Sequence, residues 1–180
     1  MLEEPRRPWL DAGELKNKFH ALTALHHPDV AGAAGDFSAL NAAYQALREP
    51  ATRLRHLLEL EWPAGLAGGQ DAPPGIADLF MKMGSLQHAL HAFRKKQQAA
   101  SIPLAHAVLA PERLGLVHAF EEWLAVLNAK EAGLLEELRL LDAGWEAEKP
   151  MNRLAALYQG FSYLSKWTGQ VREGLFILKS

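Results

Sequence analysis

The sequence predicts an all-α protein in which an N-terminal antiparallel helical hairpin precedes a C-terminal three-helix bundle. Apolar residues recur every three or four positions along almost the whole chain, and no segment keeps the alternating pattern of a β-strand. A stretch dense in glycine and proline, residues 61–75, separates shorter helical segments from longer ones and is typical of a linker. Hydrophobic residues make up 49% of the 180 positions, which is enough to supply a core.

The hairpin is predicted from two helical segments between residues 11 and 47. Asp11 and Glu14 have the spacing of a capping pair, and the apolar face behind them consists of Leu15, Phe19, Leu22 and Leu25. Asp36 is predicted to cap the second helix, whose apolar side carries Phe37, Leu40, Tyr44 and Leu47. Pro50 suits the first position of a short third helix that includes Leu54, Leu57 and Leu58.

The bundle is predicted from three longer segments after the linker. The first has an apolar stripe formed by Ile76, Leu79, Met83, Leu86, Leu90 and Phe93. Residues 101–112 break the pattern, and Pro111 is predicted to open a long helix with a stripe through Leu114, Val117, Phe120, Leu124, Leu127, Leu134, Leu138 and Leu141. The last helix is predicted to begin near Met151. Three long helices joined by short breaks indicate an antiparallel bundle.

Composition narrows the classes of function. A formal charge of −2 argues against a protein that binds nucleic acid through bulk charge. Because cysteine is absent, the chain has no disulfide, no thiolate ligand for a metal or cluster, and no cysteine nucleophile. No apolar run suits a signal peptide or is long enough to span a bilayer, so we expect a cytoplasmic protein that does not bind membranes.

One histidine pair has a spacing that would let both side chains bind the same metal ion. His88 and His91 stand three residues apart on a predicted helix. No carboxylate or third histidine stands at a matching spacing, so we expect a surface pair and neither a metal nor a cofactor.

The tripeptide His27-Pro28-Asp29 lies where the first helix gives way to a loop. Proline disfavours helix in the residue before it, and Asp is common in turns, so the tripeptide by itself is explained as a helix stop. Its surroundings suggest more. A helix, then HPD, then a loop, then a helix with the pattern F-x-x-L-N-x-A-Y-x-x-L resembles the J-domain of DnaJ-type co-chaperones.

The resemblance extends along most of the chain. The stretch LNAAYQALREPATRLRHLLEL resembles the corresponding part of HscB, the J-protein of iron–sulfur cluster assembly. The stretch IADLFMKMGSLQHAL is similar to the first helix of that family's client-binding domain, and the helix near Met151 is similar to its last. The resemblance implies a J-domain at residues 1–60, a linker at 61–75 and a helical client-binding domain at 76–180.

The resemblance implies a co-chaperone that stimulates the ATPase of a DnaK/HscA-type chaperone and is not itself an enzyme. His27, Pro28 and Asp29 would contact that chaperone, with Pro28 stiffening the loop so that binding costs less entropy. Lys16 and Lys18 on the preceding helix would steer the encounter toward an acidic chaperone face. Two features of the N-terminal part depart from the family. Val30 stands where a lysine commonly follows HPD, and the family's first helix is reduced to an N-terminal segment with few apolar residues.

The resemblance also implies a client, an IscU-type scaffold for cluster assembly, bound to an apolar patch with an acidic rim. The apolar part corresponds to Phe80, Met81 and Tyr163. The large apolar residue of the next turn is replaced by Gly84, and the expected glutamates are replaced by Ser85 and His88. We therefore expect a client to bind mainly by apolar burial, with a weak dependence on salt.

Two other functions remain open. The chain could be a J-domain-like interaction module with a different client or without coupling to a chaperone, as Val30 and the small number of lysines on the first helix allow. It could also be an all-α metal-dependent hydrolase that uses His27 and Asp29. No nucleophile, phosphate loop or dinucleotide motif accompanies these two residues, which disfavours the hydrolase.

Overall fold

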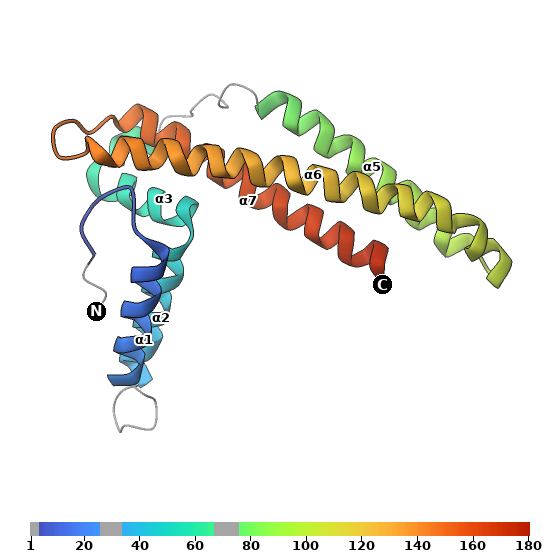
Figure 1. The fold of residues 1–180 in the computed structure, drawn as a ribbon, viewed down its shortest axis with the longest axis horizontal. Coiled ribbons are helices and arrows are strands. Elements are labelled where there is room, and N and C mark those ends of the chain that lie inside the picture. Colours follow the sequence, from blue (N-terminus) through green and yellow to red (C-terminus); the bar gives the residue numbers. More distant parts are fainter. Residues whose placement is uncertain (1–3, 26–33, 67–75) are drawn as a thin grey trace. The chain divides into compact units, whose positions relative to one another are not determined.

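The computed structural model describes residues 4–25, 34–66 and 76–180, and every regular element in these ranges is a helix. Figure 1 shows α1 (Ala12–Leu25), α2 (Ala34–Arg48), α3 (Pro50–Glu61), α4 (Pro63–Leu66), α5 (Ile76–Ala99), α6 (Pro103–Ala143) and α7 (Met151–Lys179). The predicted all-α class is confirmed. Within the described residues, no helix combines the length and the apolar character needed to cross a membrane.

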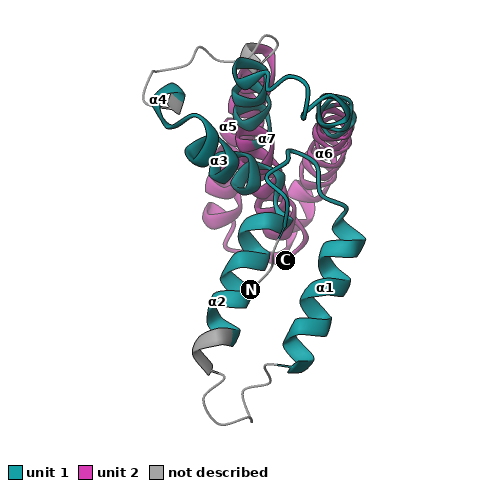
Figure 2. Ribbon diagram, turned by 90° about the vertical axis from the view of Figure 1, so that its left-hand side faces the viewer, with its two compact units in different colours: residues 1–71, 134–161 teal, residues 72–133, 162–180 magenta. Residues whose placement is uncertain are grey.

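The chain forms two compact units (Figure 2). Unit 1 consists of Met1–Asp71 together with Leu134–Phe161, and unit 2 consists of Ala72–Gly133 together with Ser162–Ser180. The long helices α6 and α7 each take part in both units. The division at residues 60 and 76 implied by the family resemblance stays a prediction, but the contacts group the α6–α7 turn with the N-terminal hairpin.

Helices α1 and α2 form the antiparallel hairpin of unit 1 (Figures 1 and 2). The predicted cap at its start is present, since Asp11 Oδ1 accepts a 2.9 Å hydrogen bond from the Glu14 N–H. Leu15 and Leu40 are buried between the helices, and their cover is completed by Phe19, Leu22, Ala43, Tyr44 and Leu47. The rings of Phe19 and Tyr44 stack with their centroids 4.2 Å apart.

Helix α3 begins with Pro50 in the first turn, as predicted, and contributes a buried face to the main core of unit 1. This core combines residues of α3 with the end of α6 and the start of α7: Leu54, Leu57, Leu58, Leu138, Trp145, Leu154, Ala155, Leu157 and Phe161. The third N-terminal helix is therefore covered by side chains that lie more than 75 positions later in the sequence.

Unit 2 packs α5 against parts of α6 and α7 (Figure 2). Its buried side chains are Leu79, Met83, Leu86, Leu90 and Phe93 of α5, Phe120, Trp123 and Leu127 of α6, and Leu164, Trp167, Val171 and Leu178 of α7. Gly174 allows α7 to lie close to α6, because a Cβ at this position would collide with the ring of Phe120. The predicted apolar stripe of α5 is buried from Leu79 to Phe93.

Two predicted helix starts were wrong. Helix α6 begins at Pro103 rather than at Pro111, which lies inside it. Pro111 is on an exposed side of the helix, so the carbonyl that loses its N–H partner is open to water and the helix continues. Helix α2 begins at Ala34, two residues before the predicted cap at Asp36. The predicted linker contains the short helix α4.

The predicted stripe of α6 was wrong at its first member. Leu114 is exposed, and Trp123 is buried on the face that packs against the other helices. The helix starts earlier than predicted, and its first part extends past the end of α7, so apolar spacing there does not imply burial.

Candidate functional site

The predicted chaperone-binding tripeptide His27-Pro28-Asp29 lies outside the described residues. The described neighbours of this segment are the end of α1 at Leu25 and the start of α2 at Ala34. In the sequence, the tripeptide stands between these two ends, and its contact with a chaperone stays a prediction.

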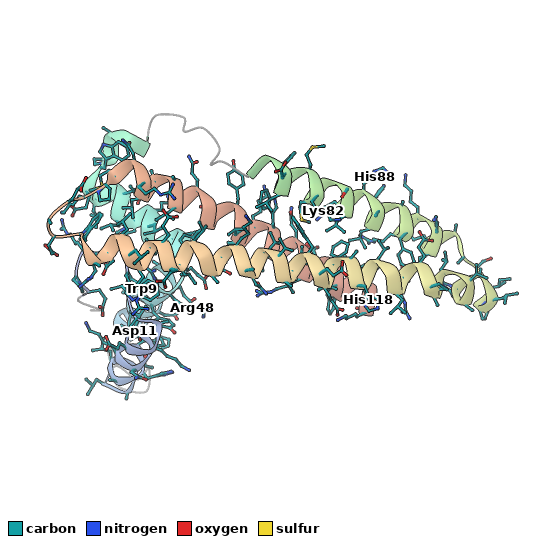
Figure 3. The ribbon with its side chains drawn as sticks, turned by 45° about the horizontal axis from the view of Figure 1, so that its top comes forward. Trp9, Asp11, Arg48, Lys82, His88 and His118 are labelled. Carbon is teal, nitrogen blue, oxygen red and sulfur yellow. The ribbon has the colours of Figure 1, made fainter. Side chains whose placement is uncertain are left out.

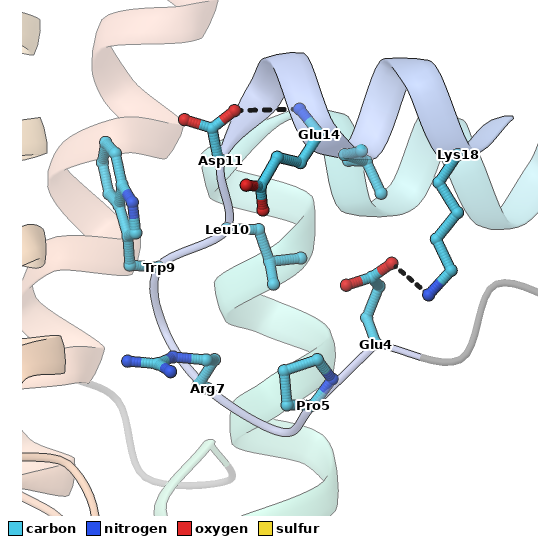
Figure 4. Close-up of a pocket in the computed structure, with 9 residues that line it drawn as sticks. Glu4, Pro5, Arg7, Trp9, Leu10, Asp11, Glu14 and Lys18 are labelled. Carbon is cyan, nitrogen blue, oxygen red and sulfur yellow. Dashed lines mark hydrogen bonds and ion pairs between the residues drawn. The ribbon is translucent and has the colours of Figure 1, made fainter. Parts of the chain in front are cut away.

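The two predicted steering lysines differ in their surroundings. Lys16 is exposed on α1. Lys18 Nζ lies 2.8 Å from Glu4 Oε1, in an ion pair with the N-terminal segment (Figure 4). Because Glu4 offsets the charge of Lys18, the positive face of α1 is weaker than the sequence suggested.

The N-terminal segment 4–11 is not helical, and a buried carboxylate holds it in place. The Arg7 Nε donates to both oxygens of Asp142 at 3.0 Å, and the Trp9 N–H donates to Asp142 Oδ1 at 3.0 Å. The hydrogen bond with Asp142, and then its charge, raise the pKa of Arg7. Asp142 stands in the last turn of α6, so the segment is fixed to the end of that helix.

Two further side chains bind the same segment from other elements. The buried Arg53 of α3 donates from Nε to the Pro8 carbonyl at 3.0 Å and from Nη1 to the Leu47 carbonyl at 2.9 Å. Burial lowers the pKa of Arg53, opposed by the charges of Asp142 and Glu49. Trp145 Nε1 donates to the Arg6 carbonyl at 2.8 Å.

We call segment 4–11 with its three anchors, Asp142, Arg53 and Trp145, the N-terminal strap. It occupies the part of the chain where the resemblance placed the first helix of a J-domain. The sequence analysis missed the strap. Its only sequence signals were the proline and arginine residues before Trp9 and a tryptophan in the α6–α7 turn.

A cavity of about 510 Å³ opens beside the strap, lined in part by Glu4, Arg7, Asp11, Glu14 and Lys18 (Figure 4). Most of these charged groups form ion pairs or hydrogen bonds within the protein. Glu4 pairs with Lys18, Arg7 pairs with Asp142, and Asp11 caps α1. The cavity is therefore explained by the packing of the strap on α1.

The three predicted client-binding residues are exposed in unit 2. Phe80 and Met81 of α5 are 64% and 73% exposed, and Tyr163 of α7 is 39% exposed. The ring of Tyr163 lies 5.5 Å from that of the buried Trp167. One turn after Phe80, a side chain at Gly84 would meet nothing within 4 Å. The client site stays a prediction, and its three residues are open to solvent as such a site requires.

The predicted histidine pair is also exposed on α5, where Figure 3 labels His88. Across residues 4–25, 34–66 and 76–180, no group of three or more His, Cys, Asp or Glu residues could hold a metal ion.

Comparison with known proteins finds likeness among solved structures. No family model matches the chain. No curated protein matches it either. Among solved structures, the chaperone HscB from Vibrio cholerae aligns over 94% of this chain and 91% of its own, with a TM-score of 0.56 and 21% sequence identity. The protein therefore has an HscB-like fold.

Proposed function

We propose that the protein is a cytoplasmic co-chaperone that stimulates the ATPase of a DnaK/HscA-type chaperone and delivers a client to it. The observation that carries the proposal is the position of His27-Pro28-Asp29 between the two helices of an N-terminal hairpin in an HscB-like fold. Residues 1–60 act as the J-domain and residues 76–180 as the client-binding domain.

In this function the chain performs no covalent chemistry. The carboxylate of Asp29 binds a cationic group on the chaperone, His27 adds a polar contact, and Pro28 limits the conformations of the loop. The exposed Lys16 contributes more to steering than Lys18, because Glu4 already pairs with Lys18. Binding in turn favours the state of the chaperone that hydrolyses ATP.

The proposed client is an IscU-type iron–sulfur scaffold. What supports this client is the HscB-like fold and the exposure of Phe80, Met81 and Tyr163 on α5 and α7. A contact of this kind is driven by apolar burial.

The test is the ATP turnover of purified DnaK with and without this protein. Asp29→Asn keeps the size of the side chain and removes its charge, so the fold should survive and the stimulation should disappear. Asp78→Asn, the same change on an exposed residue of α5, is the matched control and should stimulate like wild type.

Circular dichroism of both variants separates function from folding. If Asp29→Asn stimulates as well as wild type, the HPD mechanism is wrong. If the wild-type protein stimulates neither DnaK nor HscA, the chain is better described as an interaction module without chaperone coupling.

A further inference from the structure

Helix α6 extends well beyond the end of α7. Lys179, the last residue of α7, pairs with Glu121 of α6 at 2.7 Å, which marks where α7 ends along α6. From Pro103 to Glu121, α6 runs for about 27 Å at 1.5 Å per residue. Helix α5 accompanies this part, since Lys96 Nζ lies 2.7 Å from Glu112 Oε1. Beyond α7, the three-helix packing thus becomes a two-helix hairpin (Figure 1).

An open groove follows the end of α7. A cavity of about 150 Å³ lies between α5 and α6, lined by Phe93, Gln97, His106, Leu109, Ala110 and Arg113. Leu109 precedes Phe120 by three helical turns, so both lie on the same face of α6. Phe120 contacts α7 at Gly174. The groove is therefore on the face of α6 that α7 covers farther along.

The charged residues around this groove are mainly basic. The sequence from residue 79 to residue 111 contains four Lys or Arg residues and no Asp or Glu, although the whole chain has a net charge of −2. Arg113 is exposed at the groove, and Arg94 is exposed directly after Phe93. Glu112, which precedes Arg113 in the sequence, is paired with Lys96. An anionic occupant complements this surface.

We propose that this groove binds an acidic amphipathic helix of a partner protein. A helix is the expected shape, because the same face of α6 holds α7 along the rest of unit 2. An apolar side chain of the partner packs on the partly exposed Leu109, with the buried Phe93 as the floor of the groove, and carboxylates on the flanking turn face Arg94 and Arg113. The proposal does not depend on the co-chaperone function, and the predicted client patch lies elsewhere on α5.

The test uses a fluorescein-labelled three-heptad peptide of Leu, Ala and Glu, with Leu on one helical face, and measures its binding by fluorescence anisotropy. A peptide with Lys in place of Glu is the charge control and should bind at least about tenfold more weakly. Hydrogen exchange should show slower exchange of the amides around Phe93 and Leu109 in the presence of the acidic peptide.

Two matched pairs of variants locate the binding. Arg113→Glu should weaken binding of the acidic peptide by about tenfold or more, while Lys130→Glu, an equal change of charge on exposed α6 surface, should alter it by less than about twofold. Ala110→Glu should weaken binding as Arg113→Glu does. Ala129→Glu should not weaken it, because Ala129 is exposed on α6 about 28 Å from Ala110. Circular dichroism confirms that each variant is folded.

Several outcomes would overturn the proposal. One is that the acidic peptide does not bind the wild-type protein, and another is that Arg113→Glu and Lys130→Glu weaken binding equally.

Leu104 and Val108 of α6 are 70% and 71% exposed, which makes a lipid surface the main alternative occupant. If the protein sediments with phosphatidylserine vesicles and the acidic peptide does not reduce this binding, the occupant of the groove is a membrane. A wild-type dimer dissociated by Ala110→Glu would identify it as a second copy.

Discussion

Asp142 is the residue on which the N-terminal strap depends most directly. It is buried, and it accepts hydrogen bonds from both the Arg7 side chain and the Trp9 backbone. Asp142 lies 135 positions from Arg7 and 133 positions from Trp9 in the sequence. A buried carboxylate with charged and backbone donors is stabilising only while its partners stay in place.

Replacing Asp142 with Asn keeps the volume and removes the charge that Arg7 faces. We expect the free energy of unfolding in urea to fall by about 1.5–3 kcal/mol, the range for a hydrogen bond to a charged group. Glu137→Gln is the control, because its ion pair with Arg153 is on the surface and should contribute less than about 1 kcal/mol. Equal losses in the two variants would show that the strap adds little to stability.

Glu61 offers a test that depends on pH. Lys149 donates a hydrogen bond to its carboxylate and lowers its pKa, with a further contribution from Arg6, while partial burial opposes the shift. A carboxyl group whose pKa is lowered in the folded state stabilises the protein at pH values above its pKa in the unfolded chain, about 4.3. This stabilisation is lost as the pH falls through the pKa of the folded state.

Glu61→Gln should therefore be less stable than wild type at neutral pH, and the difference should shrink as the pH falls below about 4. Urea unfolding at several pH values measures the difference. Glu173→Gln, on an exposed position of α7, is the control. A difference between wild type and Glu61→Gln that is constant with pH would show that the ion pair with Lys149 is not its source.

At the scale of elements, α5 and α7 present the predicted client patch. Met81→Ala combined with Tyr163→Ala should lower the affinity for an IscU-type scaffold by at least about tenfold, because apolar anchors dominate such contacts. The affinity should change little between low and high salt. Isothermal titration calorimetry measures both effects.

Phe176→Ala is the matched control for the client patch. Phe176 is an exposed aromatic residue on α7, outside the predicted patch. It should leave the scaffold affinity unchanged. If Phe176→Ala weakens binding and the double variant does not, the client site is elsewhere on the bundle.

The boundaries of the elements show where local rules succeed. Asp11 and Pro50 begin helices as predicted, because capping and the fixed φ of proline act within one turn. Pro111 failed as a helix start, because it lies inside α6. There proline removes one backbone hydrogen bond and crowds the carbonyl four residues earlier, and the residues on both sides continue the helix despite this cost.

At the scale of the whole molecule, the compact units do not coincide with continuous stretches of sequence. Helix α3 belongs to the N-terminal part of the chain, but Leu138, Leu154 and Phe161 cover it. A fragment of residues 1–75 lacks this cover and the strap anchors Asp142 and Trp145. We expect the α3 amides to exchange with solvent much faster in the fragment than in the full chain.

Hydrogen exchange followed by mass spectrometry measures this difference. The α1–α2 hairpin is the internal control, because its own core of Leu15 and Leu40 lies within the fragment. Equal protection of α3 in the fragment and the full chain would show that the N-terminal domain is independent of the bundle.

The sequence by itself determined the all-α class, most of the helices and the HPD tripeptide, because helical periodicity and caps depend on residues three or four positions apart. The tertiary structure alone decided that Lys18 pairs with Glu4, that Asp142 holds Arg7, and that Leu114 is exposed while Trp123 is buried. These outcomes depend on which distant segments meet and on where α7 ends along α6. A local pattern records that a residue is apolar or charged, but only the folded chain determines what lies opposite it.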